Sequence, residues 1–130
     1  MNDGAEEERS VPAPGKGIQS LNELLSASSF KSSSRILILI LLAMNKRMDS
    51  VDLREFTKLG KGSLENHLSK LEEAGLVTTR KVKFFGGRRQ TVEITKAGLE
   101  SCRTLLQTIQ GLDGQMEWGQ AQGSETIDSD

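Results

Sequence analysis

The feature that most constrains the fold is the spacing of apolar residues and glycines between Val51 and Gly98. Two apolar sets recur at helical steps, the first made of Leu53, Phe56 and Leu59 and the second of Leu64, Leu68 and Leu71. Gly60-Lys61-Gly62 separates the two sets, and Gly75 follows the second. This spacing predicts two short helices around a turn, which is a helix-turn-helix.

A cationic β-hairpin is predicted to follow these helices. Leu76 to Val82 and Gln90 to Ile94 are strand-like, and Phe84 to Arg89 joins them through two glycines, which allow a tight turn. A third helix is expected after Thr95, whose hydroxyl can cap the first amides of that helix. Its apolar seam comprises Leu99, Cys102, Leu105, Leu106 and Ile109.

The segment from Arg35 to Asn45 is apolar at every position from Ile36 to Leu42, so a buried strand and a buried helix would look similar. We favour a helix, because Leu41 to Asn45 favours helix and Ser32 to Ser34 offer a cap. A helix that is apolar all round is expected to be covered on two sides. Those sides would be the domain core and a second subunit.

The remaining segments set the domain boundaries. Residues 1–17 form an acidic tail with little to bury and are predicted to be disordered, and so are residues 111–130. Ser20 is expected to cap a short helix, with Glu23 three residues later. Arg47-Met48-Asp49 fits a short edge strand, after which Asp49 or Ser50 would cap the next helix. One domain over residues 18–110 is therefore predicted.

Charge is divided unevenly along the chain, although the formal net charge is only -1. Residues 31–98 contain 14 Lys or Arg and 7 Asp or Glu, which gives a net charge of +7. Residues 1–30 contain 2 against 5, and residues 99–130 contain 1 against 6, which gives -3 and -5. A basic middle between acidic ends indicates an anionic partner for the middle.

Several classes of protein are disfavoured by the sequence. Cys102 is the only cysteine, so an intrachain disulfide cannot form, and with one histidine, His67, we expect no metal site, no cofactor and no enzyme. Residues 36–44 are about half the roughly 20 apolar residues of a membrane-spanning helix. Residues 1–9 are acidic and unlike a signal sequence. We expect a cytoplasmic protein that is not inserted in a membrane.

The segment from Lys61 to Val77, followed by a basic hairpin and by Val92 to Gly98, resembles winged-helix transcriptional regulators of the MarR/ArsR kind. It is closest to small single-domain versions common in archaea. The resemblance covers about half the chain. It implies a mainly α fold with a small β-hairpin, a winged helix-turn-helix domain with extra N- and C-terminal helices for dimerisation. It also implies a homodimer that binds operator DNA with the second helix, the recognition helix, in the major groove.

The recognition helix offers the first group of candidate DNA contacts. If Leu64, Leu68 and Leu71 face the core, then a rotation of about 100° per residue turns Asn66, Ser69 and Lys70 outward. Asn66 can pair with an adenine edge, Lys70 with guanine or phosphate, and Ser69 with either. Lys61 and Ser63 lie at the helix start, which favours a phosphate. Taken alone, the helix fits an ordinary solvated polar face equally well.

The hairpin, or wing, offers the second group, which comprises Arg80, Lys81, Lys83, Arg88 and Arg89. Strand alternation places Lys81 and Lys83 on one face. Arg88 and Arg89 at a Gly-Gly tip could enter a minor groove or hold phosphates. Charges on a hairpin also serve as edge protection. Beside a recognition helix, we favour phosphate contact.

These expectations combine into one functional prediction with two alternatives. We predict a sequence-specific regulator of double-stranded DNA, a homodimer and a repressor, because no activation domain is visible. The first alternative is a winged-helix protein-interaction adaptor without DNA binding. The second is a redox or small-molecule sensor that also binds DNA, in which Cys102 would be the redox group. The sequence does not identify an effector.

Overall fold

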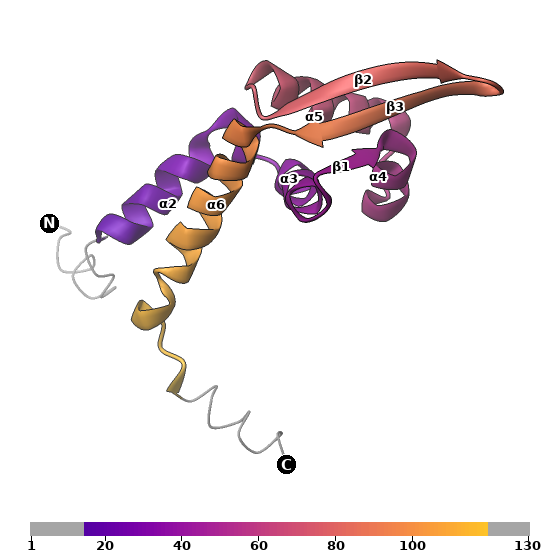
Figure 1. Cartoon of the computed structure of the whole chain (residues 1–130). Helices are drawn as coiled ribbons and strands as arrows, with labels where there is room; N and C mark the ends of the chain where they lie inside the picture. Colours follow the sequence, from indigo (N-terminus) through magenta and orange to yellow (C-terminus); the bar gives the residue numbers. More distant parts are fainter. Residues whose placement is uncertain (1–14, 120–130) are drawn as a thin grey trace, which may run out of the picture.

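In a computed structural model of the chain, the residues described are 15–119, and in that range they form five α-helices and a three-stranded sheet (Figure 1). In chain order the elements are α2 (Lys16–Ser26), the 3-10 turn η1 (Ser28–Phe30), α3 (Ser33–Asn45), β1 (Arg47–Asp49), α4 (Ser50–Thr57), α5 (Lys61–Glu73), β2 (Val77–Phe84), β3 (Gly87–Ile94), α6 (Lys96–Gln110) and the 3-10 turn η2 (Asp113–Gln115). The predicted fold class, a mainly α winged helix-turn-helix domain, is confirmed. No helix in this range combines the length and hydropathy needed to span a bilayer.

The predicted helix between Arg35 and Asn45 is α3, which lies at the centre of the core. Its N-cap is Ser32, whose hydroxyl accepts a hydrogen bond from the Arg35 amide at 3.3 Å. Its fully or largely buried apolar residues are Ile38, Leu39, Leu41 and Leu42. Met44 at the end of the helix is 75% exposed, so the chain alone does not cover α3 on every side.

The helix-turn-helix is formed by α4 and α5, and its core side is mostly as predicted. Leu53 and all three leucines of α5 are buried. The prediction for Phe56 is wrong, because its side chain is 63% exposed. The helix α4 has only eight residues and ends at Thr57, and the next residue, Lys58, adopts the left-handed conformation. The chain turns there, and Leu59 packs on the core in place of Phe56.

The sheet is antiparallel in the order β1-β3-β2 and includes the predicted edge strand. The hairpin turn is tighter than predicted. Only Phe85 and Gly86 lie between the strands, since Phe84 pairs with Gly87. Positive φ angles of 103° at Gly86 and 156° at Gly87 allow this reversal. Arg88 therefore lies within β3 and not at the tip, and Figure 1 shows the hairpin extending beyond the helices.

The helices α2 and α6 lie side by side at one end of the domain (Figure 1). The cap predicted at Ser20 is wrong, because α2 begins at Lys16 after an extended Gly15 and Ser20 lies inside the helix. Leu112 is buried beyond the end of α6, and a Cβ on Gly17 would lie 3.0 Å from its Cδ2. The segment directly after α6 therefore packs against the start of α2. The predicted tails otherwise lie mostly outside the described residues, at 1–14 and 120–130.

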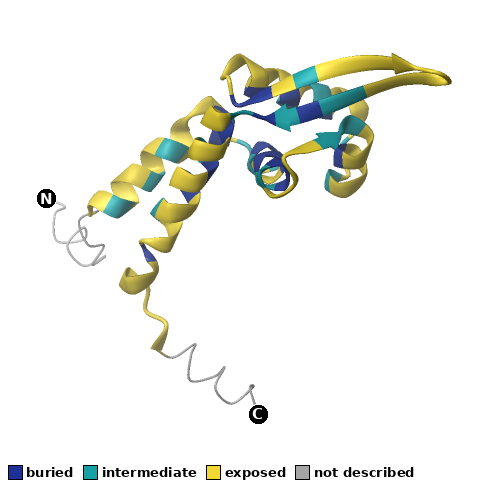
Figure 2. Cartoon of the chain, in the orientation of Figure 1, coloured by how far each residue is buried: buried dark blue, intermediate teal, exposed yellow. Residues whose placement is uncertain are grey.

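Thr95 caps the start of α6, as predicted. Its hydroxyl accepts a hydrogen bond from the Gly98 amide at 3.0 Å and donates one to the Gly75 carbonyl at 2.7 Å. The predicted seam divides into two groups. Cys102 and Leu105 are buried, whereas an exposed stripe consists of Leu99, Leu106 and Ile109. Figure 2 shows the buried residues of α6 along one side of the helix only.

Candidate nucleic-acid interface

The rotation of α5 leaves a polar side of the helix exposed. Leu64, Leu68 and Leu71 point into the core, and the opposite side carries Asn66, Ser69 and Lys70, all of which are exposed. Lys61 and Ser63 lie in the exposed first turn, which begins at Gly60 without a side-chain cap. Because no side chain competes for the first amides, this turn favours an anion. The structure thus presents all five predicted helix residues to solvent.

The five predicted wing cations do not share one face of the hairpin. Residues opposite each other in an antiparallel pair lie on the same side of the sheet. Lys81 pairs with Gln90 and Lys83 with Arg88, on the side continuous with the buried pair formed by Val77 and Ile94. Arg80 pairs with Thr91, and Arg89 with Val82, on the other side. The register agrees with the predicted placement of Lys81 and Lys83 on one face, and it places Arg80 and Arg89 on the other.

The inner side of the wing forms a groove with the starts of α4 and α5. Its volume is about 620 Å³. We call it the basic groove, because its lining includes five cations, Arg54, Lys61, Lys81, Arg88 and Arg89. Two carboxylates, Asp49 and Glu65, also line it. The fold thus brings Lys61 of the recognition helix together with three predicted wing residues.

Arg54 is the groove residue that sequence reasoning missed. It belongs to α4, and its neighbour Leu53 is fully buried, so the chain places Arg54 at the surface beside the start of α5. A signal was present, because an arginine next to the inward residue of the first helix of a helix-turn-helix must point outward. Its closeness to the wing depends on how α4 packs against β3, which the sequence pattern does not specify.

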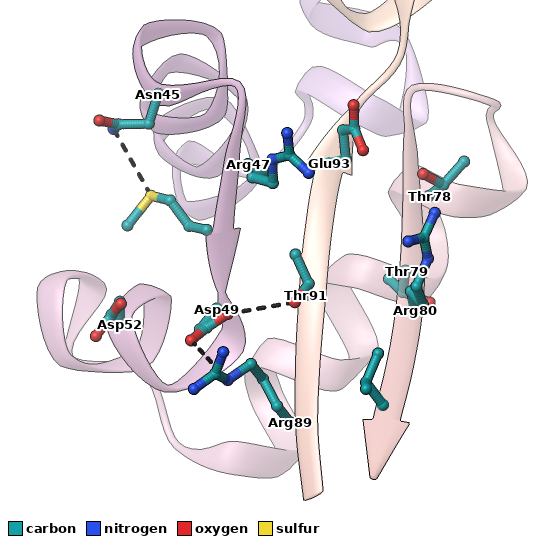
Figure 3. A pocket seen from close by; sticks show the side chains of 12 residues that line it. Asn45, Arg47, Asp49, Asp52, Thr78, Thr79, Arg80, Arg89, Thr91 and Glu93 are labelled. Atoms are coloured by element: carbon teal, nitrogen blue, oxygen red, sulfur yellow. Dashed lines mark hydrogen bonds and ion pairs between the residues drawn. The ribbon is translucent and has the colours of Figure 1, made fainter. Parts of the chain in front are cut away.

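The outer side of the wing carries a different environment, drawn in Figure 3. A pocket of about 870 Å³ lies over the three strands. Three cations, Arg47, Arg80 and Arg89, are balanced there by three carboxylates, Asp49, Asp52 and Glu93. Arg80 is therefore separated from the basic groove, whereas Arg89 borders both hollows. The balanced charge makes this outer pocket a weaker phosphate site than the basic groove.

Asp49 fixes the base of the wing instead of capping α4. Its carboxylate lies 3.4 Å from Arg89 Nε and accepts a hydrogen bond from the Thr91 hydroxyl at 3.3 Å (Figure 3). Asp49 does occupy the N-cap position of α4, one of the two predicted, but its side chain makes no capping hydrogen bond. The Arg89 guanidinium also lies 5.2 Å from the centre of the Phe84 ring. These contacts connect the start of α4 to the middle of β3.

The acidic residues of α5 have separate positions. Glu72 faces the sheet, where its carboxylate accepts a hydrogen bond from the Thr79 hydroxyl at 3.1 Å. Glu65 is half-buried and lines the basic groove beside Lys61. Only Glu73, in the last turn, stays exposed on the same side as Asn66. Most of the negative charge of this helix therefore lies away from its exposed polar side.

His67 is a packing residue and not part of the exposed side of α5. Its Nδ1 lies 3.0 Å from the Arg35 guanidinium, which is largely buried and also donates to the Ser28 carbonyl at 3.1 Å. Burial, and then the charge of Arg35, lower the pKa of His67. The imidazole is therefore neutral at pH 7 and accepts at Nδ1.

Cys102 does not have the environment of a redox sensor. It is buried in α6, and this burial raises the pKa of its thiol. Reactive cysteines have a lowered pKa and are accessible. Within residues 15–119, no group of three or more His, Cys, Asp or Glu is placed to hold a metal ion.

Comparison with known proteins agrees with this geometry. The family model described as "Winged helix DNA-binding domain" matches residues 34–112. An uncharacterized protein of Methanocaldococcus jannaschii is 34% identical over 88 residues, which cover 68% of this chain and 96% of that protein.

Solved structures extend the similarity. A transcriptional regulator homologue protein from Pyrococcus horikoshii is similar with a TM-score of 0.68 at 28% identity, covering 76% of this chain and 99% of that one. MepR, a transcription regulator of the Staphylococcus aureus multidrug efflux pump MepA, has the same fold with a TM-score of 0.62 at 13% identity, covering 87% and 84%. The resemblance to winged-helix regulators, including archaeal ones, is confirmed. This chain therefore belongs to the winged helix DNA-binding domain family, a family of transcriptional regulators and not of enzymes.

Proposed function

We propose that this protein is a homodimeric, cytoplasmic repressor that binds a specific operator sequence in duplex DNA. The observation that carries the proposal is the basic groove beside the exposed side of α5. In this arrangement α5 enters the major groove, and Asn66, Ser69 and Lys70 face the base edges. One phosphate strand then runs along the basic groove, between the start of α5 and the inner side of the wing.

The roles of the two groups differ physically. Lys61, Lys81 and Arg88 contact phosphates and contribute affinity that falls with salt, without sequence information. Asn66 carries a donor and an acceptor on one side chain, so it can pair with an adenine edge. Ser63 donates to a phosphate from the first turn of α5, and Lys83 and Arg80 add longer-range attraction from the wing.

Selection of bound fragments from a pool of random DNA duplexes tests whether the protein binds a specific DNA sequence. The wild-type protein is expected to enrich one motif, and its log affinity to fall linearly with log salt concentration. Asn66→Ala should reduce discrimination at one base pair by about 1–3 kcal/mol, because a bidentate contact is lost, and leave the salt dependence unchanged. Lys70→Gln serves as the comparison, since losing a cation should reduce the salt dependence. Absence of duplex binding even at low salt would reject the proposal and favour a protein-interaction adaptor.

Exposed apolar stripes on α2 and α6 support the dimer. Leu99 and Leu106 are seven residues apart on α6, Ile109 follows three residues later, and Ile18 and Leu25 are seven residues apart on α2. Each is about 40% exposed in the single chain. Such spacing keeps apolar side chains on one side of a helix, which suits pairing with a second copy. Two-fold symmetry would then require a roughly palindromic operator with half-sites about one helical turn apart.

Light scattering tests the dimer directly. The wild-type protein should have twice the mass of a 14.2 kDa chain. Ile109→Glu should give the monomer mass with an unchanged helical circular dichroism spectrum, because it places a charge on the stripe without touching the buried core. A wild-type monomer at the concentrations used for DNA binding would contradict the dimer while leaving DNA binding by one domain intact.

A further inference from the structure

The two phenylalanines at the end of the wing are in different environments. Phe84 is half-exposed, and its ring lies under the Arg89 guanidinium. Phe85 is the first residue of the turn and is 103% exposed, so nothing in the described chain covers any part of it. The Phe84 ring therefore stabilises the wing through Arg89. The Phe85 ring is exposed to solvent in the turn at the end of the wing.

Cations surround this exposed ring. Lys83 precedes it by two residues, and Arg88 and Arg89 follow it by three and four. Lys83, before the turn, pairs with Arg88, after the turn, so the two cations lie side by side on the side of the wing that faces the basic groove. A matching partner must offer negative charge on either side of an apolar slot. The minor groove of a duplex has this form, with two phosphate rows above stacked bases.

The size of the wing restricts what can enter that groove. Paired strands lie about 4.8 Å apart before their side chains are counted, whereas the minor groove is only about 6 Å wide. The two-stranded ribbon is therefore too broad, but a single side chain at the turn is not. Arg89 contacts Asp49 and Phe84, and these contacts link the strands next to the turn to the start of α4.

We infer that Phe85 enters the minor groove next to the half-site read by α5 and wedges against a base step, partly unstacking it. This inference rests on the proposed DNA-binding function and adds a contact to it. Apolar wedges of this kind kink the duplex at steps that unstack easily. Phe85 therefore contributes sequence preference through DNA deformability, at a position where it forms no hydrogen bond.

The experiment uses the full-length protein and a selected duplex carrying 2-aminopurine at successive positions beside the α5 half-site. Wild-type protein should increase the fluorescence at one step, because unstacking relieves quenching. Phe85→Ala should bind about tenfold more weakly, the effect expected for losing one aromatic contact with a base, and should abolish the increase. Phe85→Leu keeps an apolar wedge and should retain part of both effects.

Phe56→Ala is the matched control, because Phe56 is also exposed but lies on α4 and lines no hollow with the wing. It should bind and unstack the duplex as the wild type does. If Phe85→Ala matches the wild type in affinity and fluorescence, the wedge is wrong although DNA binding stands. If Phe85→Ala loses only binding to phosphatidylserine vesicles, the partner is a membrane and the inference is also overturned. If the wild type binds no duplex, the proposed function itself fails.

Discussion

The triple variant Lys61→Gln, Lys81→Gln, Arg88→Gln is expected to bind operator DNA about a hundredfold more weakly than the wild type near physiological salt. The three side chains come from two elements, α5 and the hairpin, and line one groove. Each lost phosphate contact should reduce the slope of log affinity against log salt by about 0.9. A fluorescence anisotropy titration at four or more salt concentrations measures both quantities.

The control is a triple variant with the same change in net charge at exposed positions outside the basic groove, namely Lys31→Gln, Lys96→Gln and Arg103→Gln. It should retain most of the affinity and most of the slope. Equal losses in the two triple variants would mean that net charge alone attracts DNA and that the groove is not a phosphate path. The enriched sequence motif should be the same for both triple variants, because neither removes a base contact.

Gly98→Ala is expected to destabilise the fold by about 2–3 kcal/mol, the range of a severe overpacking substitution. A Cβ at this position would lie 2.7 Å from Ile94 Cγ1 and closer still to the Leu76 carbonyl oxygen. The backbone oxygen cannot move aside as a flexible side chain can, so α6 must shift away from the sheet. That shift also disturbs the hydrogen bond from the Gly98 amide to Thr95. A urea titration followed by circular dichroism measures the loss.

Gly62→Ala is the matched control for this substitution. Gly62 is also helical, and apart from its chain neighbours and the backbone of its own helix no atom lies within 4 Å of the place where its Cβ would be. Its unfolding free energy should stay equal or rise by up to about 1 kcal/mol, because alanine loses less backbone entropy than glycine. A Gly98→Ala protein as stable as the wild type would show that α6 and the sheet are not in close contact.

The parts of the fold that local pattern determines could be predicted. Leu64, Leu68 and Leu71 fix the rotation of α5, because three large apolar side chains at helical steps can face the core in only one way. Ser32 and Thr95 mark helix starts through side-chain oxygens that satisfy amides within three residues. The edge strand predicted at Arg47-Met48-Asp49 is β1.

What could not be predicted depends on contacts between distant residues. The faces of the wing cations depend on strand register, and register depends on whether the turn is centred on Phe85 and Gly86 or further along. The ion pair between Asp49 and Arg89 joins residues forty positions apart, so the local signal for a helix cap indicated the position of Asp49 but not the partner of its side chain. Arg54 faces the groove for the same reason, because α4 packs against a strand formed much later in the chain.

The Arg35 guanidinium joins its own helix to the nearby turn after α2 and to α5, which comes 32 residues later at His67. Its Nε donates a hydrogen bond to the Ser28 carbonyl, in the turn directly after α2. Its terminal nitrogen donates one to Nδ1 of His67 on α5. Arg35 lies in the first turn of α3, so its side chain links α3 to the turn after α2 and to α5. If two copies of the chain pair through α2 and α6, the angle between the two copies sets the distance between their two recognition helices. Operators whose half-sites differ from that spacing by a single base pair would then be poor substitutes for one another.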